Sequence, residues 1–397
     1  MNRKSFFTFQ ALVFILVAAG ISTIYLTQPV LPILEREFGV NPSQASYTVS
    51  AVILGIALAN LPFGMLADRF PVKRLILVGG LVVAAGAFFC ATTARLAPLV
   101  GARFVQGLFV PALTTCLAAY LSANLPLERL NVAMGAYVSA TVAGGLGGRL
   151  LSGWITPPQH WRYAFFIDAL LVLLASLAAV LWLPQGKLPK ESNQSSEGFL
   201  ALLSHRELRR VYLVPFAGLF VFGSIFNYLP FYLHRPPFNA STRLITFMYL
   251  TYLVGVFIGP MAGRLSNRIS NGGTMILGSL VFALAIGLTL IKSVYVIGLG
   301  LVLVCAGFFS IHAAAVGSLN RKLTSSRGRA NSFYVMAYYL GGAIGITVFG
   351  QAYGLAGWHG VAALGLVVLT VPLLIGFKEM RGGETGPRSN EKLSAGV

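Results

Sequence analysis

Apolar runs of about 20 residues constrain the fold of this chain more than any other feature of its sequence. Twelve of them follow one another, at about 6–31, 47–67, 75–94, 98–121, 132–154, 163–183, 211–233, 246–265, 274–291, 295–319, 330–353 and 360–377. A helix needs about 20 residues to cross the hydrocarbon core of a bilayer. Backbone polar groups in lipid must be satisfied within the span, so the sequence predicts an all-α membrane protein with twelve transmembrane helices.

Composition excludes a soluble domain. The chain is 56% apolar and only 10% charged, with a mean hydropathy of +0.77, whereas soluble domains carry about 25% charged residues. A net charge of +18 would suggest nucleic-acid binding in a soluble protein, but here the bases lie in short segments between apolar runs and indicate membrane topology instead. Cys90, Cys116 and Cys305 lie inside apolar runs without paired spacing, which favours small buried side chains over disulfides or metal ligands.

The polar segments divide the chain. The first apolar run follows Arg3 and Lys4, but it is too long for a secretory signal and no small-x-small cleavage site follows it, so it is expected to be the first span. A charged stretch from Pro184 to Arg210 has the composition of a linker. We expect an amino-terminal six-helix half at 1–184, a cytoplasmic central loop at 185–210, a carboxy-terminal half at 211–378 and a cytoplasmic tail at 379–397. Most lysines and arginines fall in loops on one side, which predicts that both termini are cytoplasmic.

A short charged turn between two apolar runs is repeated half a chain later. The segment from Gly64 to Arg74 contains an Asp-Arg pair followed by Lys-Arg, and a similar segment runs from Gly263 to Arg268. Gly107-Leu108-Phe109 likewise matches Gly307-Phe308-Phe309. This internal duplication predicts two pseudo-symmetric six-helix halves, an arrangement found in transporters that bind substrate between the halves near the membrane midplane.

The charged turn resembles the Gly-x-Leu-Ala-Asp-Arg-x-Gly-Arg-Lys signature between helices two and three of the major facilitator superfamily. Pro71 stands in place of the second glycine of that signature, and Val72 in place of a base. In the family, this loop holds the cytoplasmic side shut through a contact with the amino end of the eleventh helix, here near Ala330. The resemblance therefore implies a conformational gate made of Gly64, Asp68, Arg69, Lys73, Arg74, Gly263, Asn267 and Arg268.

Two more stretches resemble family motifs. The residues from Arg103 to Gly107 match Arg-x-x-Gln-Gly, whose arginine the family associates with proton coupling. Glycines in the fifth span follow the spacing Gly-x8-Gly-x3-Gly-Pro-x2-Gly-Gly of drug:H+ antiporters, with Arg149 replacing the proline and Ser152 one glycine. The resemblance covers essentially the whole chain. Within the superfamily, the chain is similar to sugar- or drug-efflux permeases of bacterial inner membranes. The resemblance implies glycines at the interface of the halves, although close helix packing alone also explains them: Gly135, Gly144, Gly148 and Gly153.

The family lines its central cavity with the first and fourth helices of each half. Carried onto this sequence, that rule gives a substrate cavity lined by Tyr25, Gln28, Arg103, Gln106, Asn227, Tyr228, His312 and Tyr338. Phenylalanines surround these positions, and a mixture of rings with few polar groups is usual for small-molecule sites. The set favours a small amphipathic organic solute over a densely charged one.

Carboxylates are scarce, which narrows the choice of proton-coupling groups. Of the eleven acidic residues, only Asp168 lies inside a predicted span, and the first span has none, although many antiporters of this branch carry one there. His312 could substitute, since imidazole titrates near pH 6.5, or it could be a hydrogen-bonded core histidine. The candidate proton-coupling residues are His312, Asp168, Arg103 and Arg149.

Arg149 is expected to have a polar partner, because an unpaired guanidinium inside a span costs about 2.5 kcal/mol or more at the helix centre. Two arrangements remain open. It could pair with Asp168 on the neighbouring helix, or it could face the cavity and meet Gln28, Asn227 or an anionic group of the substrate.

These features predict a secondary active transporter that exports its solute by alternating access, coupled to proton antiport. The alternative is an importer or uniporter of the same fold. A membrane-embedded enzyme is a remote alternative, because no metal-ligand cluster, nucleophile–base spacing or nucleotide loop is visible. We expect no cofactor and no metal. The expected partners are a small-molecule substrate, protons and the lipid bilayer, with no nucleic acid and no obligate protein partner.

Overall fold

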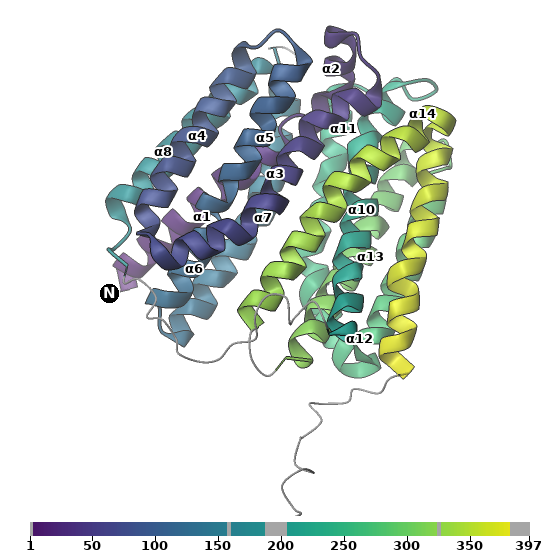
Figure 1. Ribbon diagram of the computed structural model, residues 1–397. Helices are drawn as coiled ribbons and strands as arrows, with labels where there is room; N and C mark the ends of the chain where they lie inside the picture. Colours follow the sequence, from purple (N-terminus) through teal and green to yellow (C-terminus); the bar gives the residue numbers. More distant parts are fainter. Residues whose placement is uncertain (1–2, 157–159, 187–204, 324–326, 382–397) are drawn as a thin grey trace, which may run out of the picture.

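The computed structural model describes residues 3–156, 160–186, 205–323 and 327–381, and within these ranges the chain is helical without strands (Figure 1). The first half contains α1 (Arg3–Tyr25), η1 (Gln28–Val30), α2 (Leu31–Phe38), α3 (Pro42–Arg69), α4 (Val72–Thr92), α5 (Leu96–Leu113), α6 (Thr115–Asn124), α7 (Leu127–Ile155) and α8 (Arg162–Trp182). The second contains α10 (Arg206–His234), α11 (Thr242–Met248), η2 (Tyr249–Leu253), α12 (Val254–Leu288), α13 (Val294–Arg321) and α14 (Arg327–Arg381).

These elements make twelve crossings. In the described part of the chain, nine helical segments are long and apolar enough to span a bilayer. Two of them contain two crossings each, because the 242–288 segment reverses at Ser270 and the 330–381 segment reverses at Ala356 and Gly357, where the backbone leaves helical geometry. The helix α7, with 29 residues, is the remaining crossing. The predicted all-α, twelve-helix fold is confirmed.

Prolines explain where the helices depart from the predicted runs. The first run is broken after Tyr25 and continues as η1 and α2, since Pro29 and Pro32 cannot donate backbone hydrogen bonds. The fourth run is split between α5 and α6 at Thr114, three residues beyond Pro111. The central loop was predicted to extend to residue 210, but α10 begins earlier, at Arg206. Residues 187–204 of that loop and 382–397 of the predicted tail lie outside the described residues.

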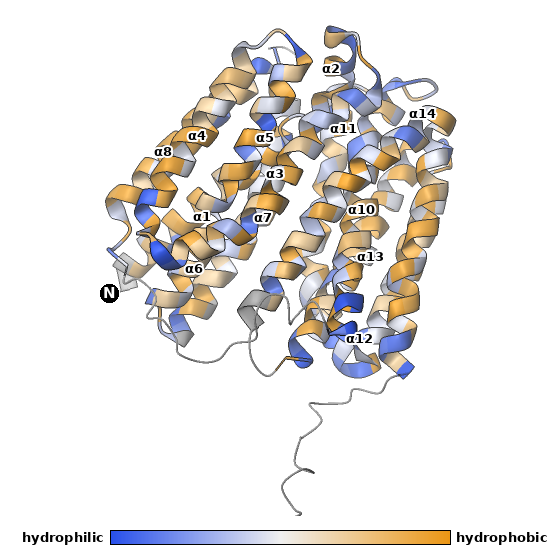
Figure 2. Ribbon diagram, in the orientation of Figure 1, coloured by the Kyte–Doolittle hydropathy of each residue, from blue (hydrophilic) through white to orange (hydrophobic). Residues whose placement is uncertain are grey.

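The helices gather into two groups (Figure 1). In the first, α1 packs against α7 and α8, while α5 packs against α3 and α4. In the second, α12 packs against α13, and α10 against α14. Large apolar side chains such as Leu170, Leu181 and Leu284 are exposed on the outside, and the outer helices are predominantly hydrophobic in Figure 2. That surface suits the hydrocarbon of a bilayer.

The two groups meet on one side of the molecule. We call the side where α1 begins and α14 ends the terminal side, and the opposite one the distal side. On the distal side, Asn227 Nδ2 donates to Ser46 Oγ at 2.8 Å, and Arg235 forms an ion pair with Glu35 at 2.9 Å. Gly153 of α7 lies directly against Thr246 of α11. Since each of these contacts joins residues of different halves, the halves are closed together on the distal side.

Candidate functional site

A cavity of about 420 Å³ lies between the two halves. Its walls are largely aromatic and come from α1, η1, α3, α7, α10, η2, α13 and α14. The lining also includes Val316, near the end of α13, and Asn331, near the start of α14, and both of these helix ends lie on the terminal side. The polar and aromatic residues that line it are Tyr25, Gln28, Tyr137, Thr141, Arg149, Phe222, Tyr252, Phe308, Phe309, His312, Asn331, Tyr334, Tyr338 and Tyr339.

Arg149 projects from α7 into this cavity and is only 1% exposed. Its Nε donates to Gln28 Oε1 at 2.7 Å, and one terminal nitrogen donates to the Gly145 carbonyl at 2.7 Å. The other terminal nitrogen donates to the Tyr252 hydroxyl at 3.0 Å, across to the second half. The guanidinium also lies over three tyrosine rings, at 3.8, 4.3 and 5.2 Å from their centroids: Tyr25, Tyr252 and Tyr249.

The structure decides between the two arrangements open for Arg149. The guanidinium meets Gln28 in the cavity, and no pair with Asp168 is formed. The Asp168 side chain turns instead toward α1, which lies between α7 and α8 and packs against both. Of the two arrangements, the cavity-facing one is therefore formed: Arg149 bonds to Gln28 of η1, and Asp168 bonds to Ser22 and Thr23 of α1.

Asp168 is fully buried inside the first half. Its Oδ1 accepts a hydrogen bond from Ser22 at 2.7 Å, and its Oδ2 accepts one from Thr23 at 2.8 Å. Arg103 is the cation that acts on it electrostatically. Two hydroxyl donors satisfy the carboxylate, so the group is held in place without a direct ion pair.

Arg103 and Gln106 do not line the cavity, contrary to the prediction. The Arg103 guanidinium is fully buried and donates to the carbonyls of Ile24 and Thr48 at 2.7 and 3.0 Å and to Gln106 Oε1 at 2.8 Å. Gln106 in turn donates to the Val83 carbonyl. These bonds turn both side chains into the packing of α1, α3, α4 and α5.

Asn227 and Tyr228 also lie away from the cavity lining. Both are fully buried on the distal side, where Asn227 bonds to Ser46 and the Tyr228 hydroxyl donates to the Ile346 carbonyl at 2.8 Å. They occupy the closed contact between the halves. Of the eight predicted cavity residues, the lining contains Tyr25, Gln28, His312 and Tyr338.

His312 reaches the cavity from α13, inside an aromatic shell. The Tyr334 hydroxyl lies 2.9 Å from Nδ1 of the imidazole. The Phe308 ring stacks on it at 5.9 Å, and the Tyr338 ring lies at 5.4 Å between centroids. The histidine is thus hydrogen-bonded and lies in the cavity, while its role in proton coupling stays a prediction.

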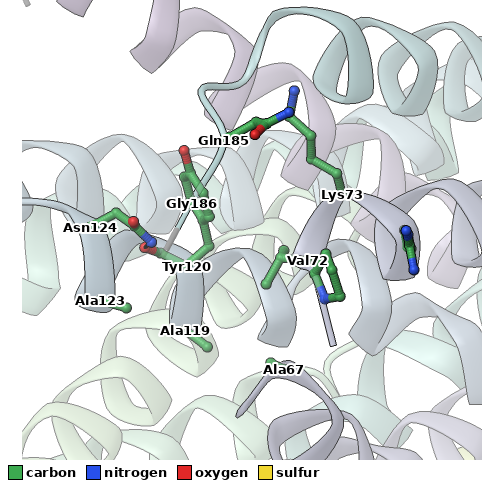
Figure 3. A pocket seen from close by; sticks show the side chains of 11 residues that line it. Ala67, Val72, Lys73, Ala119, Tyr120, Ala123, Asn124, Gln185 and Gly186 are labelled. Carbon is green, nitrogen blue, oxygen red and sulfur yellow. Dashed lines mark hydrogen bonds between the residues drawn. The ribbon is translucent and has the colours of Figure 1, made fainter. Parts of the chain in front are cut away.

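The predicted gate residues lie on the terminal side, at the junction of α3 and α4. Asp68 and Arg69 are exposed at the end of α3. Lys73 and Arg74 line a second cavity of about 520 Å³, together with residues of α6 and the segment after α8. Figure 3 shows Tyr120 and Asn124 of α6 on one side of this space and Lys73 on the other. Both walls belong to the first half.

The second copy of the gate lies within α12, where Asn267 accepts a hydrogen bond from Arg321 at 3.3 Å and Arg268 is exposed. Gly64 and Gly263 face open space, so a side chain at either position would meet no neighbour within 4 Å. Steric crowding therefore does not require glycine at these two positions.

The predicted interface glycines fall into three different environments. Gly144 and Gly148 lie against the backbone of Ala18 and Ser22 in α1, inside the first half, which corrects the expectation that they lie between the halves. Gly153 does lie between the halves, and Gly135 faces open space. Small residues allow this close approach of α7 to α1.

Several cavity tyrosines were not singled out by the sequence. Tyr252 lies in η2, a 3-10 turn between α11 and α12, and its hydroxyl and ring both contact Arg149. Tyr137 of α7 and Tyr334 of α14 complete the wall. An aromatic residue in an apolar span carries no sign of the direction it faces, so only the unexplained Arg149 could have pointed to these rings.

Comparison with known proteins assigns a family. The family model described as Major Facilitator Superfamily matches residues 11–345. An MFS-type transporter of Bacillus subtilis, YybF, is 26% identical, and the match covers 98% of each chain. The inner membrane transport protein YnfM of Escherichia coli is 28% identical, over 91% of this chain and 88% of the relative.

Solved structures agree in fold. A bacterial homolog of the human lysosomal transporter Spinster, in an inward-facing conformation, matches with a TM-score of 0.75 at 16% identity, over 96% of this chain and 98% of that one. A D-xylose-proton symporter matches with a TM-score of 0.76 at 15% identity, over 95% and 99%. Their arrangement of helices is therefore shared by this chain.

Proposed function

This chain belongs to the Major Facilitator Superfamily, and on that premise we propose that it exports a small amphipathic organic solute by alternating access, in exchange for protons. The family and the named relatives are transporters, not enzymes. The observation that carries the proposal is the cavity between the halves, whose lining extends toward the terminal side while the halves meet on the distal side. Its size and ring-rich walls suit a small organic molecule.

The terminal side is proposed to face the cytoplasm of a bacterial inner membrane. Its loops carry basic residues such as Arg69, Lys73, Arg74 and Arg264, and cytoplasmic loops are enriched in such residues. The relative YnfM is named an inner membrane transport protein. In this orientation, the cavity reaches toward the cytoplasm and is ready to receive a solute for export.

Four consecutive residues of α1 supply a physical route for proton coupling. Ser22 and Thr23 bond to Asp168, the Ile24 carbonyl accepts from Arg103, and Tyr25 lies against Arg149 in the cavity. Protonation of Asp168 would weaken its hold on the two hydroxyls, because a neutral acid is a poorer acceptor than a carboxylate. Any resulting movement of α1 reaches the cavity directly, so proton and solute can be coupled without sharing one site.

Transport assays with the purified protein in liposomes test this function. A panel of labelled organic compounds is offered with and without a pH gradient across the membrane. Export in exchange for protons predicts that an inward gradient accelerates solute movement in the opposite direction. Movement with the proton would favour the importer alternative, and movement indifferent to the gradient would favour a uniporter.

Asp168→Asn should abolish the response to the pH gradient while leaving downhill flux of the solute. The amide keeps the shape and still accepts from a hydroxyl, but it cannot bind or release a proton. His312→Ala is the matched test of the other titratable group. We expect this variant to retain the response to the pH gradient. The test covers about pH 5.5 to 7.5, because an unperturbed imidazole titrates in that interval. The reverse result would transfer the coupling role to His312.

Asp68→Asn should slow transport without unfolding the protein. Asp68 is exposed at the end of α3, and the family resemblance pairs it with the amino end of the eleventh helix, near Ala330, when the cytoplasmic side is shut. An anion at a helix amino terminus contributes about 0.3–1 kcal/mol when exposed, and up to about 2 in partly buried geometry. Its loss would bias the protein toward the state that is open on the terminal side. Transport rates at equal expression test this, with Asn267→Ala, which removes no charge, as the milder control.

A further inference from the structure

We propose, resting on the transport function above, that the cavity selects organic anions and that Arg149 binds their negatively charged group. The apolar part of the anion would lie against the rings around it. In this proposal, Arg149 alone supplies the positive charge that binds the anion.

The charge of Arg149 has no counter-ion among the described residues of the site. Arginine stays protonated in proteins, and among the residues that the structure describes, Arg149 is the only lysine or arginine that lines this cavity. The described lining contains no aspartate or glutamate, and the buried carboxylate of Asp168 is bonded to α1 instead. The partners of the guanidinium are an amide, a carbonyl and a hydroxyl, all of them neutral. An anion entering the cavity therefore meets one uncompensated positive charge, and a cation meets repulsion.

The guanidinium also has donors to spare. Of the five N–H groups of an arginine, three are used by Gln28, Gly145 and Tyr252. The Tyr25 hydroxyl also forms a hydrogen bond with this side chain. At least one N–H of the guanidinium is therefore left for a ligand. A carboxylate, sulfonate or phosphate oxygen is the acceptor that such a fork binds most strongly.

The site is held ready before a ligand arrives. Tyr25 and Tyr252 lie against the guanidinium at 3.8 and 4.3 Å, and Gln28 fixes its Nε, so the side chain has little freedom to turn away. Phe222 and Phe308 stack at 3.9 Å in the same cavity wall, next to Phe309. An apolar body attached to the anionic group thus finds aromatic surface within the same cavity.

Binding at Arg149 also reaches the contact between the halves. The bond from its terminal nitrogen to the Tyr252 hydroxyl joins α7 of the first half to η2 of the second. An anion bound to the guanidinium lies beside this tyrosine hydroxyl. Substrate binding would thus act directly on a pair of residues that joins the halves, and a difference in this pair between the two states is what alternating access requires.

Gln28→Glu is the decisive variant. Glutamate has the shape of glutamine, and its carboxylate would lie where the Gln28 amide oxygen now accepts from Arg149 at 2.7 Å. This carboxylate would neutralise the charge of the guanidinium without changing how the Arg149 side chain packs. We expect the variant to melt at the same temperature as the wild type or higher, and to lose roughly 10- to 100-fold in affinity for anions, the range for a hydrogen bond to a charged group. Arg149→Lys, which keeps the charge but loses the fork, should lose less.

The probes are matched aromatic triplets. Benzene, naphthalene and indole rings are each offered as a carboxylate, an amide and a methylammonium, and binding to the purified full-length protein is measured by calorimetry. Tighter binding of the carboxylates, lost in Gln28→Glu, supports the proposal. Equal or tighter binding of amides or ammonium compounds, no binding of any carboxylate, or carboxylate binding unchanged in Gln28→Glu would overturn it. Uptake of the same probes into liposomes is measured separately, so that selective binding without transport would contradict the transport function and leave the anion site standing.

Discussion

Arg103→Ala should leave little folded protein. The guanidinium is fully buried and connects α1, α3 and α5 through the carbonyls of Ile24 and Thr48 and the side chain of Gln106. A hydrogen bond to a charged group contributes about 1.5–3 kcal/mol, so losing several of them removes a large part of the about 5–15 kcal/mol by which a typical protein is stable. Asp168 would also lose the cation that acts on it. The yield of monodisperse protein and its melting temperature measure the effect.

Two further variants separate the network from the charge. Arg95→Ala removes an exposed arginine just before the same helix and should melt like the wild type. Arg103→Lys keeps the charge, but a lysine cannot direct donors to α1, α3 and Gln106 at once, so it should restore little. If Arg103→Ala melted within a few degrees of the wild type, the network would not be needed for the fold.

Gly148→Ala should destabilise the protein and slow transport, whereas Gly147→Ala, one residue away, should do neither. A Cβ atom on Gly148 would lie 2.2 Å from the Ser22 carbonyl oxygen, and backbone cannot move aside without parting α7 from α1. Such overpacking costs about 1–3 kcal/mol. A Cβ on Gly147 meets nothing within 4 Å, and alanine is favoured over glycine in a helix by about 1 kcal/mol.

The transport defect of Gly148→Ala has a specific reason. Ser22, whose backbone the new methyl group would displace, also donates to Asp168. Melting temperatures and initial transport rates of the two glycine variants test the prediction together. Equal behaviour of Gly147→Ala and Gly148→Ala would show that the close approach of α7 to α1 is not needed.

Periodic and compositional features of the sequence determined the fold class. Apolar runs of membrane-spanning length predict helices wherever they occur, because unsatisfied backbone groups are too costly in lipid. Twelve such runs predicted the number of helices, and the repeat of the Gly64–Arg74 segment at Gly263–Arg268 predicted their division into two halves. The prolines at 29, 32 and 111 were visible in the sequence, but whether each one bends or ends its helix depends on what replaces the lost hydrogen bond.

The functional site was predicted only in part. Tyr25, Gln28, His312 and Tyr338 line the cavity, and Arg149 met one of the partners considered for it. Arg103, Gln106, Asn227 and Tyr228 were placed in the cavity by their span, yet they face neighbouring helices. Position along the sequence therefore predicted the depth of these residues in the membrane more reliably than the direction in which each side chain points from its helix.

The reason is geometric. Depth in the membrane follows from sequence at 1.5 Å per residue, but successive residues are turned by about 100° around the helix axis, and that rotation is fixed only by packing against other helices. Arg149 was predicted to need a polar partner, with Asp168 as one candidate, but α1 contacts each of the two charges separately: Ser22 and Thr23 bond to the acid, and Tyr25 lies against the base. The sequence determined that these charges lie within the bilayer. Only the tertiary structure decided which partner each one meets, since the rotation of α1 between α7 and α8 depends on the side chains of all three helices at once.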